Sequence, residues 1–469
     1  MLKNKVFKFL TIKFIILIII KYYDNQFQFN KFIINRQREL NLTFPKKIQK
    51  KIRIGIYTLC MKNGGRARIT AILINSLYKF QIFNIFLYTK RTKENHEYSY
   101  PKKVKRSTIN LYNITKILRN KIDILIFNIL SYRSTRIFNG INKIKIIYYL
   151  HNSIFSFIYS NYYAFFKLLY KEYTKSKYII SLIPFENDFL FKKLGINSII
   201  MKNFVTYNYK RVIPSDLSSK IIVMIGRGNN KIKNFETGIR SMEYITQVIQ
   251  DCKLKIISEL FSINNLINLI HNLNLKNKIK IEGFKENSDV FFKNVSLHFF
   301  PSIAESFGLV LCETKIYGIP TILLGLDYIS NSRNGTIIIY DDTPESLAKE
   351  AIIILLDKKY RNYLGKESRK NMKSYNNEQL TKEWVNLILN ICKNDSYYYK
   401  FKSRNLKMTD KEALLILNKQ NHILKIRKNK NINFIENITL TNYYIKNTLL
   451  IEKDTTIEKN NIILKIKLL

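Results

Sequence analysis

Short apolar runs alternate along the chain with longer stretches in which apolar residues recur every three or four positions, from about residue 52 to residue 392. Short runs rich in β-branched and aromatic residues are typical of buried strands, and the longer periodicity is typical of helices. Regular alternation of the two predicts an α/β fold, because parallel strands need crossover connections that are usually helical.

The predicted strands form two groups separated by a polar segment. The first group is expected at residues 52–58, 84–88, 122–128, 145–150, 178–182 and 198–201, and the second at 220–225, 254–258, 278–282, 297–300, 321–324 and 336–340. The segment 206–219 contains Pro214 and is the predicted linker. We therefore expect one domain at residues 51–205 and another at 220–392, without a solenoid repeat.

The segment 301–320 places two carboxylates on either side of a helix start. Glu305 and Glu313 are eight residues apart, a distance of about 12 Å along a helix axis. Two carboxyl groups that act on one glycosidic bond lie only ~5–9.5 Å apart. The spacing instead suits one carboxylate on a sugar and the other on a ribose, with Gly308 and the free N–H groups of the helix start near a diphosphate.

This segment resembles the signature of the retaining nucleotide-sugar glycosyltransferases of family 4. The family pattern is Glu, any residue, Phe-Gly, four residues and Glu, and it stands here as Glu305, Phe307, Gly308 and Glu313, followed by Gly318-Ile319-Pro320. The resemblance extends over about residues 52–392. It implies the GT-B fold, in which two Rossmann-like domains face each other across a donor cleft.

The resemblance also implies roles for these residues. Glu305 would act on the donor sugar as a catalytic residue, together with the backbone at Phe307 and Gly308. Ser306 would lie in the same donor-binding loop, and Glu313 would accept hydrogen bonds from the ribose hydroxyls.

A second motif follows the predicted strand 220–225. That strand ends in Gly226-Arg227, and Lys233-Asn234-Phe235 opens a helix. In the family, an Arg and a Lys here hold the donor diphosphate, which an Arg fork and a Lys charge at a helix start can do. The usual spacing is five, whereas Lys233 lies six and Lys231 four residues after Arg227. We assign Lys233 as the diphosphate-binding lysine because Asn-Phe follows it, as in the family. The alternative is that Arg227 and Lys233 are ordinary loop cations without a ligand role.

Two further features lie in the predicted N-terminal domain. Gly64 and Gly65 lead into a helix and resemble the family's Gly-Gly-x-x-Arg loop, which ends here at Arg68 and closes over the donor phosphates. The alternative is a plain turn before a helix. His151 follows the strand 145–150, where the family commonly has a catalytic-site histidine facing the donor sugar. The alternative is a turn residue before a capped helix.

Charge and cysteine content narrow the class of partner. Lys and Arg number 79 against 34 Asp and Glu, for a formal net charge of +45. The cations are spread along the chain, and no nucleic-acid motif accompanies them. The chain is rich in Lys, Asn, Ile, Tyr and Phe, whose codons are rich in A and T, so the base composition of the gene accounts for much of the charge. Nucleic acid is therefore not an expected partner. An anionic membrane surface or nucleotide diphosphates suit the charge better. The cysteines Cys60, Cys252, Cys312 and Cys392 have no close spacing, which favours a reducing compartment.

The two ends of the chain lie outside the resemblance. Residues 9–20 form an apolar run interrupted by Lys13, shorter than the ~20 residues of a spanning helix. We expect an uncleaved membrane-associating segment and a location at the cytosolic face of a membrane; a buried helix and a short signal anchor are the alternatives. The Lys/Asn/Ile-rich extension at residues 393–469 has no predicted role.

The resemblance implies transfer of a sugar from a nucleotide-sugar donor, with retention, to a glycan or lipid-linked acceptor. It implies no cofactor and no obligatory metal. The sequence is compatible, since no Asp-x-Asp stands in the expected place and the other histidines, His298 among them, lack metal-ligand spacing. Two alternatives are a GT-B nucleotide-sugar epimerase and a catalytically silent scaffold subunit of a membrane glycosylation complex.

Overall fold

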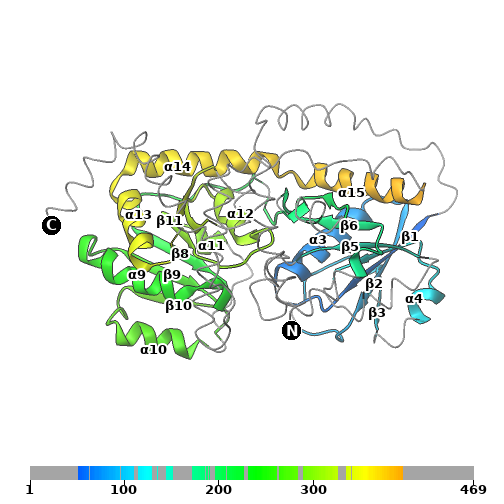
Figure 1. Ribbon diagram of the computed structural model, residues 1–469, viewed down its shortest axis with the longest axis horizontal. Helices are drawn as coiled ribbons and strands as arrows, with labels where there is room; N and C mark the ends of the chain where they lie inside the picture. Colours follow the sequence, from blue (N-terminus) through cyan, green and yellow to red (C-terminus); the bar gives the residue numbers. More distant parts are fainter. Residues whose placement is uncertain are drawn as a thin grey trace, which may run out of the picture.

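The computed structural model describes residues 51–393 except 63, 96, 110–114, 129–134, 136–143, 152–171, 185, 188–189, 191–195, 208, 227–230, 261–262, 284–288, 326–333 and 340. The described chain forms two parallel sheets, each with its own helices (Figure 1). The apolar run at residues 9–20 and the extension from residue 394 onward lie outside the described residues.

The first sheet has seven strands in the order β3-β2-β1-β4-β5-β6-β7. They are β1 (Ile52–Thr58), β2 (Phe83–Thr89), β3 (Lys105–Thr108), β4 (Ile124–Phe127), β5 (Lys145–Tyr149), β6 (Tyr178–Ser181) and β7 (Ile199–Ile200). The described helices of this half are α3 (Gly65–Tyr78) and α4 (Thr115–Arg119). All pairings are parallel.

The second sheet has six strands in the order β10-β9-β8-β11-β12-β13. They are β8 (Ile221–Ile225), β9 (Lys253–Ile257), β10 (Ile279–Glu282), β11 (Leu297–Phe300), β12 (Thr321–Leu324) and β13 (Thr336–Ile339). The helical segments are η1 (Lys231–Lys233), α9 (Phe235–Val248), α10 (Asn264–Asn272), α11 (Asp289–Phe292), α12 (Leu309–Ile316), α13 (Pro344–Leu356), α14 (Lys358–Asn371), η3 (Met372–Ser374) and α15 (Asn377–Cys392).

Both sheets contain the strand order of doubly wound folds, which confirms the predicted α/β class. In each, the order reverses between the first and fourth strands of the half, β1 beside β4 and β8 beside β11. Ligands of such folds bind outside the carboxyl ends of the strands at this reversal. The predicted site residues follow β1, β5, β8 and β11 in the chain, so the topology brings their loops to these two edges.

The local signals of the sequence account for most elements. The apolar positions Phe235, Ile239, Met242 and Ile245 of α9 are all buried. Helix α13 begins as its Thr-Pro start requires, since the Thr343 hydroxyl accepts from the Ser346 N–H at 3.3 Å. Strand β3 was not predicted. Its four residues, Lys-Arg-Ser-Thr, lie at the sheet edge and are all exposed or partly exposed, so no apolar run marks it.

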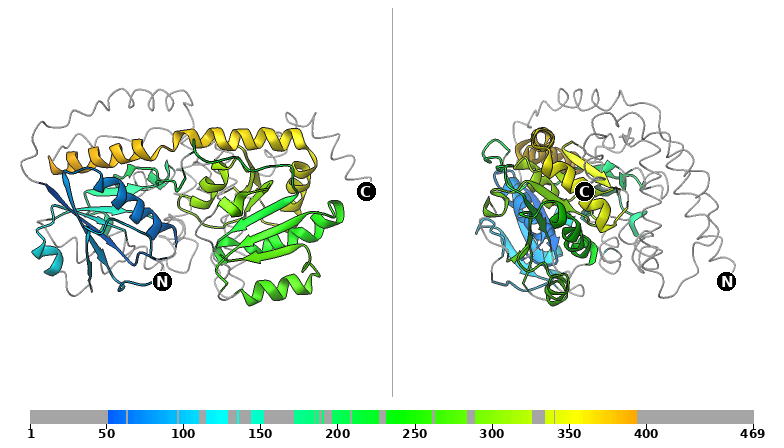
Figure 2. Two further views of the ribbon diagram at one scale, coloured as in Figure 1. Left: turned by 180° about the vertical axis from the view of Figure 1, so that it is seen from behind. Right: turned by 90° about the vertical axis from the view of Figure 1, so that its left-hand side faces the viewer.

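The last helices cross from one half of the molecule to the other. Helices α14 and α15 run along one side of both sheets (Figures 1 and 2), and α15 packs on α3 of the N-terminal half. Lys145 Nζ, at the start of β5, donates to the carbonyls of Ile391 and Cys392 at 2.8 and 3.1 Å. The sequence-based division placed residues 377–392 in the C-terminal domain, whereas α15 packs against the N-terminal one.

Among the described residues, no helix combines the length and apolar character needed to cross a bilayer.

Candidate active site

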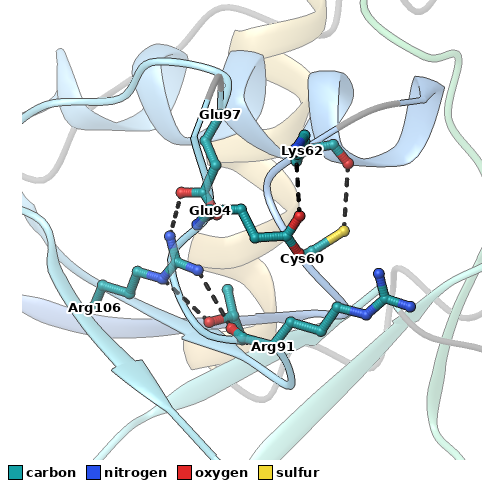
Figure 3. A network of polar contacts seen from close by, with 7 residues as sticks. Cys60, Lys62, Arg91, Glu94, Glu97 and Arg106 are labelled. Carbon is teal, nitrogen blue, oxygen red and sulfur yellow. Dashed lines mark hydrogen bonds and ion pairs between the residues drawn. The ribbon is translucent and has the colours of Figure 1, made fainter.

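A polar network fixes the loop that leads from β1 to the glycine pair (Figure 3). The Cys60 thiol donates to the Lys62 carbonyl, and Lys62 Nζ lies 3.7 Å from Glu94 Oε2. Arg106 of β3 forms an ion pair with the buried carboxylate of Glu97, and its Nη2 donates to the Arg91 carbonyl at 3.3 Å. Arg106 of the edge strand therefore holds the segment around Arg91 and Glu97, and Glu94 of that segment contacts Lys62 just ahead of the glycine pair.

Gly64 and Gly65 bring the N-terminal domain into contact with the start of α12. Gly64 has φ +90° and precedes α3, a conformation that favours glycine. A Cβ on Gly65 would lie 2.7 Å from Leu309 Cδ1, and Leu309 is the first residue of α12 in the other domain. The Leu309 side chain thus brings the N-termini of α3 and α12 next to each other. A helix N-terminus favours an anion.

Gly308 allows the chain to turn into α12. It is the N-cap residue of α12 and has φ +71°. The neighbouring Phe307 side chain is buried against Tyr375, with ring centroids 5.9 Å apart. The Phe307 side chain therefore anchors the loop in the core.

Lys233 and Glu305 form an ion pair between the ends of β8 and β11. The Lys233 side chain lies along Gly226, where a Cβ would come within 2.9 Å of Lys233 Cγ, and its ammonium lies 5.6 Å from the Phe300 ring centroid. The structure thus brings together two residues that the sequence analysis assigned to separate motifs. Arg227 and the side chain of Lys231 lie outside the described residues.

Glu313 is buried and receives hydrogen bonds from two other parts of the chain. Its Oε1 lies 2.5 Å from Arg68 Nη2 on α3 and accepts from the Thr206 hydroxyl at 2.9 Å. Burial lowers the pKa of Arg68, but the Glu313 carboxylate raises it, and the net pKa lies above its ordinary value. The sequence analysis noted Arg68 only as the end of a loop motif and missed Thr206, since a lone linker threonine carries no motif.

His151 lies where the two domains touch. Its backbone carbonyl accepts from the Ser306 hydroxyl at 2.6 Å, so Ser306, predicted to bind donor, bonds to the opposite domain. Burial, and then the charge of Arg66, lowers the pKa of His151 to about 3, so the imidazole is neutral at pH 7. The buried Nε2 has no hydrogen-bond partner among the described residues. As a neutral imidazole, the ring has one donor and one acceptor nitrogen.

His298 is a buried residue of the core. It is fully buried in β11, with Nδ1 at 3.0 Å from Thr314 Oγ1 and 3.3 Å from Thr321 Oγ1. Burial lowers its pKa to about 3. Across the part of the chain that the structure describes, no group of three or more His, Cys, Asp or Glu side chains is arranged to hold a metal ion.

Two Rossmann-like domains whose strand-end loops touch across these contacts define the GT-B class of fold. Residues 206–371 match the family described as "Glycosyl transferases group 1". The matching segment holds Lys233, Glu305 and Glu313.

Solved structures support the same fold. The chain is similar to sucrose-phosphate synthase from Thermosynechococcus elongatus, with a TM-score of 0.62 and 15% identity over 74% of this chain and 100% of that one. It is also similar to Anabaena HepE in complex with UDP-glucose, with a TM-score of 0.59 and 12% identity over 72% of this chain and 99% of that one. At this identity the likeness establishes the fold, which confirms the GT-B expectation.

A curated relative matches over part of its length. The chain is 23% identical over 183 residues to N-acetyl-alpha-D-glucosaminyl L-malate synthase of Bacillus anthracis, which is 38% of this chain and 47% of that protein. The match thus spans about half of the curated relative.

Proposed function

We propose that the protein is a retaining glycosyltransferase that moves a sugar from a nucleotide-sugar donor to a glycan or lipid-linked acceptor. The observation that carries the proposal is the meeting of the α3 and α12 N-termini beside the Lys233–Glu305 pair and Glu313. Positive ends, a cation and two carboxylates in one place match the diphosphate, sugar and ribose of one donor. The UDP-glucose complex of the similar Anabaena protein supports this donor class.

Positive charge at this point would stabilise the departing diphosphate. Negative charge builds on the leaving group as the bond to the sugar breaks, and fixed donors aimed at that charge lower the barrier. Lys233 and the two helix N-termini would supply those donors, and we propose, from the motif resemblance alone, that Arg227 adds a second cation. Because these groups can neutralise the diphosphate without a divalent ion, we propose that the reaction has no obligatory metal.

The remaining residues would hold the sugar and the nucleoside. Glu305 would accept from the sugar hydroxyls while its charge stays balanced by Lys233. His151 would hydrogen-bond the sugar through Nε2, which has no partner within the described residues, as a neutral imidazole. Glu313 would accept from the ribose. Contact between the domains would exclude water and disfavour hydrolysis of the donor.

The geometry favours transfer over the two alternatives. An epimerase needs groups that give and take protons near neutral pH, whereas the pKa of His151 is lowered to about 3 and Glu305 is held in an ion pair. A silent scaffold subunit has no need for a charged donor cradle. Incubating the full-length protein with a nucleotide-sugar and no acceptor separates these: an epimer product indicates an epimerase, and failure to bind any nucleotide-sugar indicates a scaffold.

We also propose association with the cytosolic face of a membrane. The exposed side of α14 carries Lys358, Lys359, Lys366 and Lys370, with Tyr363 59% exposed among them. A row of cations with an exposed ring suits anionic headgroups. Co-sedimentation of the protein with phosphatidylserine vesicles tests this, and equal binding to neutral phosphatidylcholine vesicles would argue against it.

The donor test uses the full-length chain and UDP-, GDP- and ADP-glucose with a broad acceptor mixture. We expect one nucleotide to be released with transfer of the sugar in the anomeric form of the donor, and turnover to persist in EDTA. Transfer with inversion would refute retention, and loss of turnover in EDTA would refute metal independence.

A further inference from the structure

Arg68 makes a charged contact across the domain boundary that the proposed reaction does not explain. It lies in the first turn of α3, where its N–H bonds to the Gly64 carbonyl at 3.3 Å. Its guanidinium leaves that domain and reaches Glu313 on α12. The Arg68 and Glu313 side chains are 23% and 8% exposed, so the pair is largely removed from water.

Both described hydrogen bonds to Glu313 fall on the same oxygen. Arg68 Nη2 lies 2.5 Å from Oε1, and the Thr206 hydroxyl donates to Oε1 at 2.9 Å. A carboxylate has acceptor sites on both oxygens. The two protein donors therefore fix the orientation of the carboxylate through Oε1 and leave acceptor capacity on Oε2 for a ligand.

The charge of Arg68 also makes the burial of Glu313 tolerable. An ionised carboxylate removed from water is costly unless a partner compensates it, and removing one member of a buried pair leaves the other uncompensated. Thr206 supplies a neutral donor, whereas Arg68 supplies the opposing charge. While Arg68 is in place, the Glu313 carboxylate therefore has an opposing charge beside Oε1.

Arg68 reaches Glu313 from an opposite domain whose contact depends on a close approach. Leu309 packs directly on Gly65, three residues before Arg68. Thr206 comes from the segment that joins the two sheets. Oε1 of Glu313, in the C-terminal domain, thus contacts both the N-terminal domain and the connecting segment.

We propose that Arg68 is a positioning residue that makes recognition of the donor's ribose depend on contact between the domains. It holds Glu313 through Oε1 so that Oε2 faces the vicinal 2′- and 3′-hydroxyls of a nucleoside diphosphate. This inference rests on the proposed function, because it assigns the nucleoside part of the same site. The ribose 2′-hydroxyl would bind the Glu313 carboxylate, which the N-terminal domain holds in place through Arg68.

The test measures the affinity of the full-length chain for UDP, GDP and ADP and for their 2′-deoxy forms by titration calorimetry. Wild type should prefer the ribonucleotide of the class it binds. Arg68→Ala should weaken that binding about tenfold or more, the scale of a lost charge-assisted hydrogen bond, and should bring the ratio of ribo to deoxy affinity close to one. Arg68→Lys should restore part of the ratio.

Matched controls separate positioning from general stability. Arg240→Ala removes an Arg–Glu pair of comparable geometry, 2.9 Å, on the exposed face of α9, and should leave both affinities unchanged. Thr206→Val removes the second bond to Oε1 without a charge change and should lower the ratio partially. If Arg68→Ala does not fold, Arg68→Lys and Thr206→Val decide the question through the same ratio.

The outcomes distinguish this inference from the proposed function. Wild type that binds no nucleotide overturns both. Wild type that binds while Arg68→Ala, or in its place Arg68→Lys together with Thr206→Val, keeps the full ribo preference overturns the positioning role alone. Tighter binding by Arg68→Ala also overturns it, since Arg68 would then compete with the donor.

Discussion

The two domains share a strand order but contribute different chemistry to the site. The C-terminal domain supplies charged side chains, Lys233 and Glu305 from the connections after β8 and β11 and Glu313 from helix α12. The N-terminal domain supplies the glycine backbone at Gly65 and the carbonyl of His151, with Arg68 as its charged contact. Two sheets with related strand orders thus contribute different kinds of group to the site. In the proposed reaction, the C-terminal domain would hold the charged donor and the N-terminal domain would cover it.

The largest effect is expected at the charged centre of the C-terminal domain. Lys233→Ala should lower kcat for glycosyl transfer by roughly 10²- to 10³-fold, because a fixed donor to the leaving diphosphate is lost. Initial rates at saturating donor measure this. Lys220→Ala, which removes an exposed pair to Asp251 at 2.8 Å, is the matched control. A rate within twofold of wild type would remove Lys233 from the reaction.

Acid should destabilise the protein through a histidine buried in the same domain. The pKa of His298 is lowered to about 3 in the fold against about 6.5 in an unfolded chain. Between these values the unfolded state binds the extra proton, so stability falls as pH drops below about 6.5, by up to about 1.4 kcal/mol per pH unit. Urea unfolding of wild type and His298→Gln at pH 7 and pH 4.5 checks this. The variant should lose less stability on acidification, and equal losses would contradict the assignment.

The domain contact itself should be sensitive to one methyl group. Gly65→Ala places a Cβ against Leu309, at 2.7 Å before relaxation, and should raise the donor KM about tenfold as the N-termini of α3 and α12 separate. Adding Leu309→Ala should restore much of the affinity by making room. Gly283→Ala serves as the control, because its Cβ would meet Leu260 at an ordinary 3.5 Å. No rescue by the second substitution would mean that the steric explanation is wrong.

The smallest effect is expected on the α14 surface, away from both sets of loops. Replacing Lys366 and Lys370 by Ala should weaken binding to phosphatidylserine vesicles about 3- to 10-fold at physiological salt, with a larger effect at low salt. Sedimentation with vesicles gives the affinity. The pair Lys276→Ala and Lys293→Ala, also exposed, is the control. If the control variant binds the vesicles as weakly as the Lys366 and Lys370 variant, net charge and not helix α14 determines the binding.

The sequence predicted elements better than it predicted contacts between them. Apolar runs located the buried strands to within about two residues, whereas the polar edge strand β3 left no such signal. Helix α15 has an apolar face, which predicts that it packs but not on which domain, and it packs on α3.

The site shows the same limit. The motif resemblance marked Lys233 and Glu305 separately, but their pairing bridges 72 positions of the chain. The bond from Thr206 to Glu313 bridges 107 and has no local pattern at either end. Local residue types predict strand-end loops with the right chemistry. Which side chains meet depends on how the two domains pack.

The most direct test of the account is nucleotide-sugar binding by the full-length protein, measured as a thermal shift with UDP-, GDP- and ADP-glucose for wild type and Glu313→Ala in parallel. The account predicts that one nucleotide class stabilises the wild type and that this stabilisation is lost in a folded Glu313→Ala variant. A well-folded wild type that none of them stabilises, or a variant stabilised as much as wild type, would contradict a donor site between the two domains.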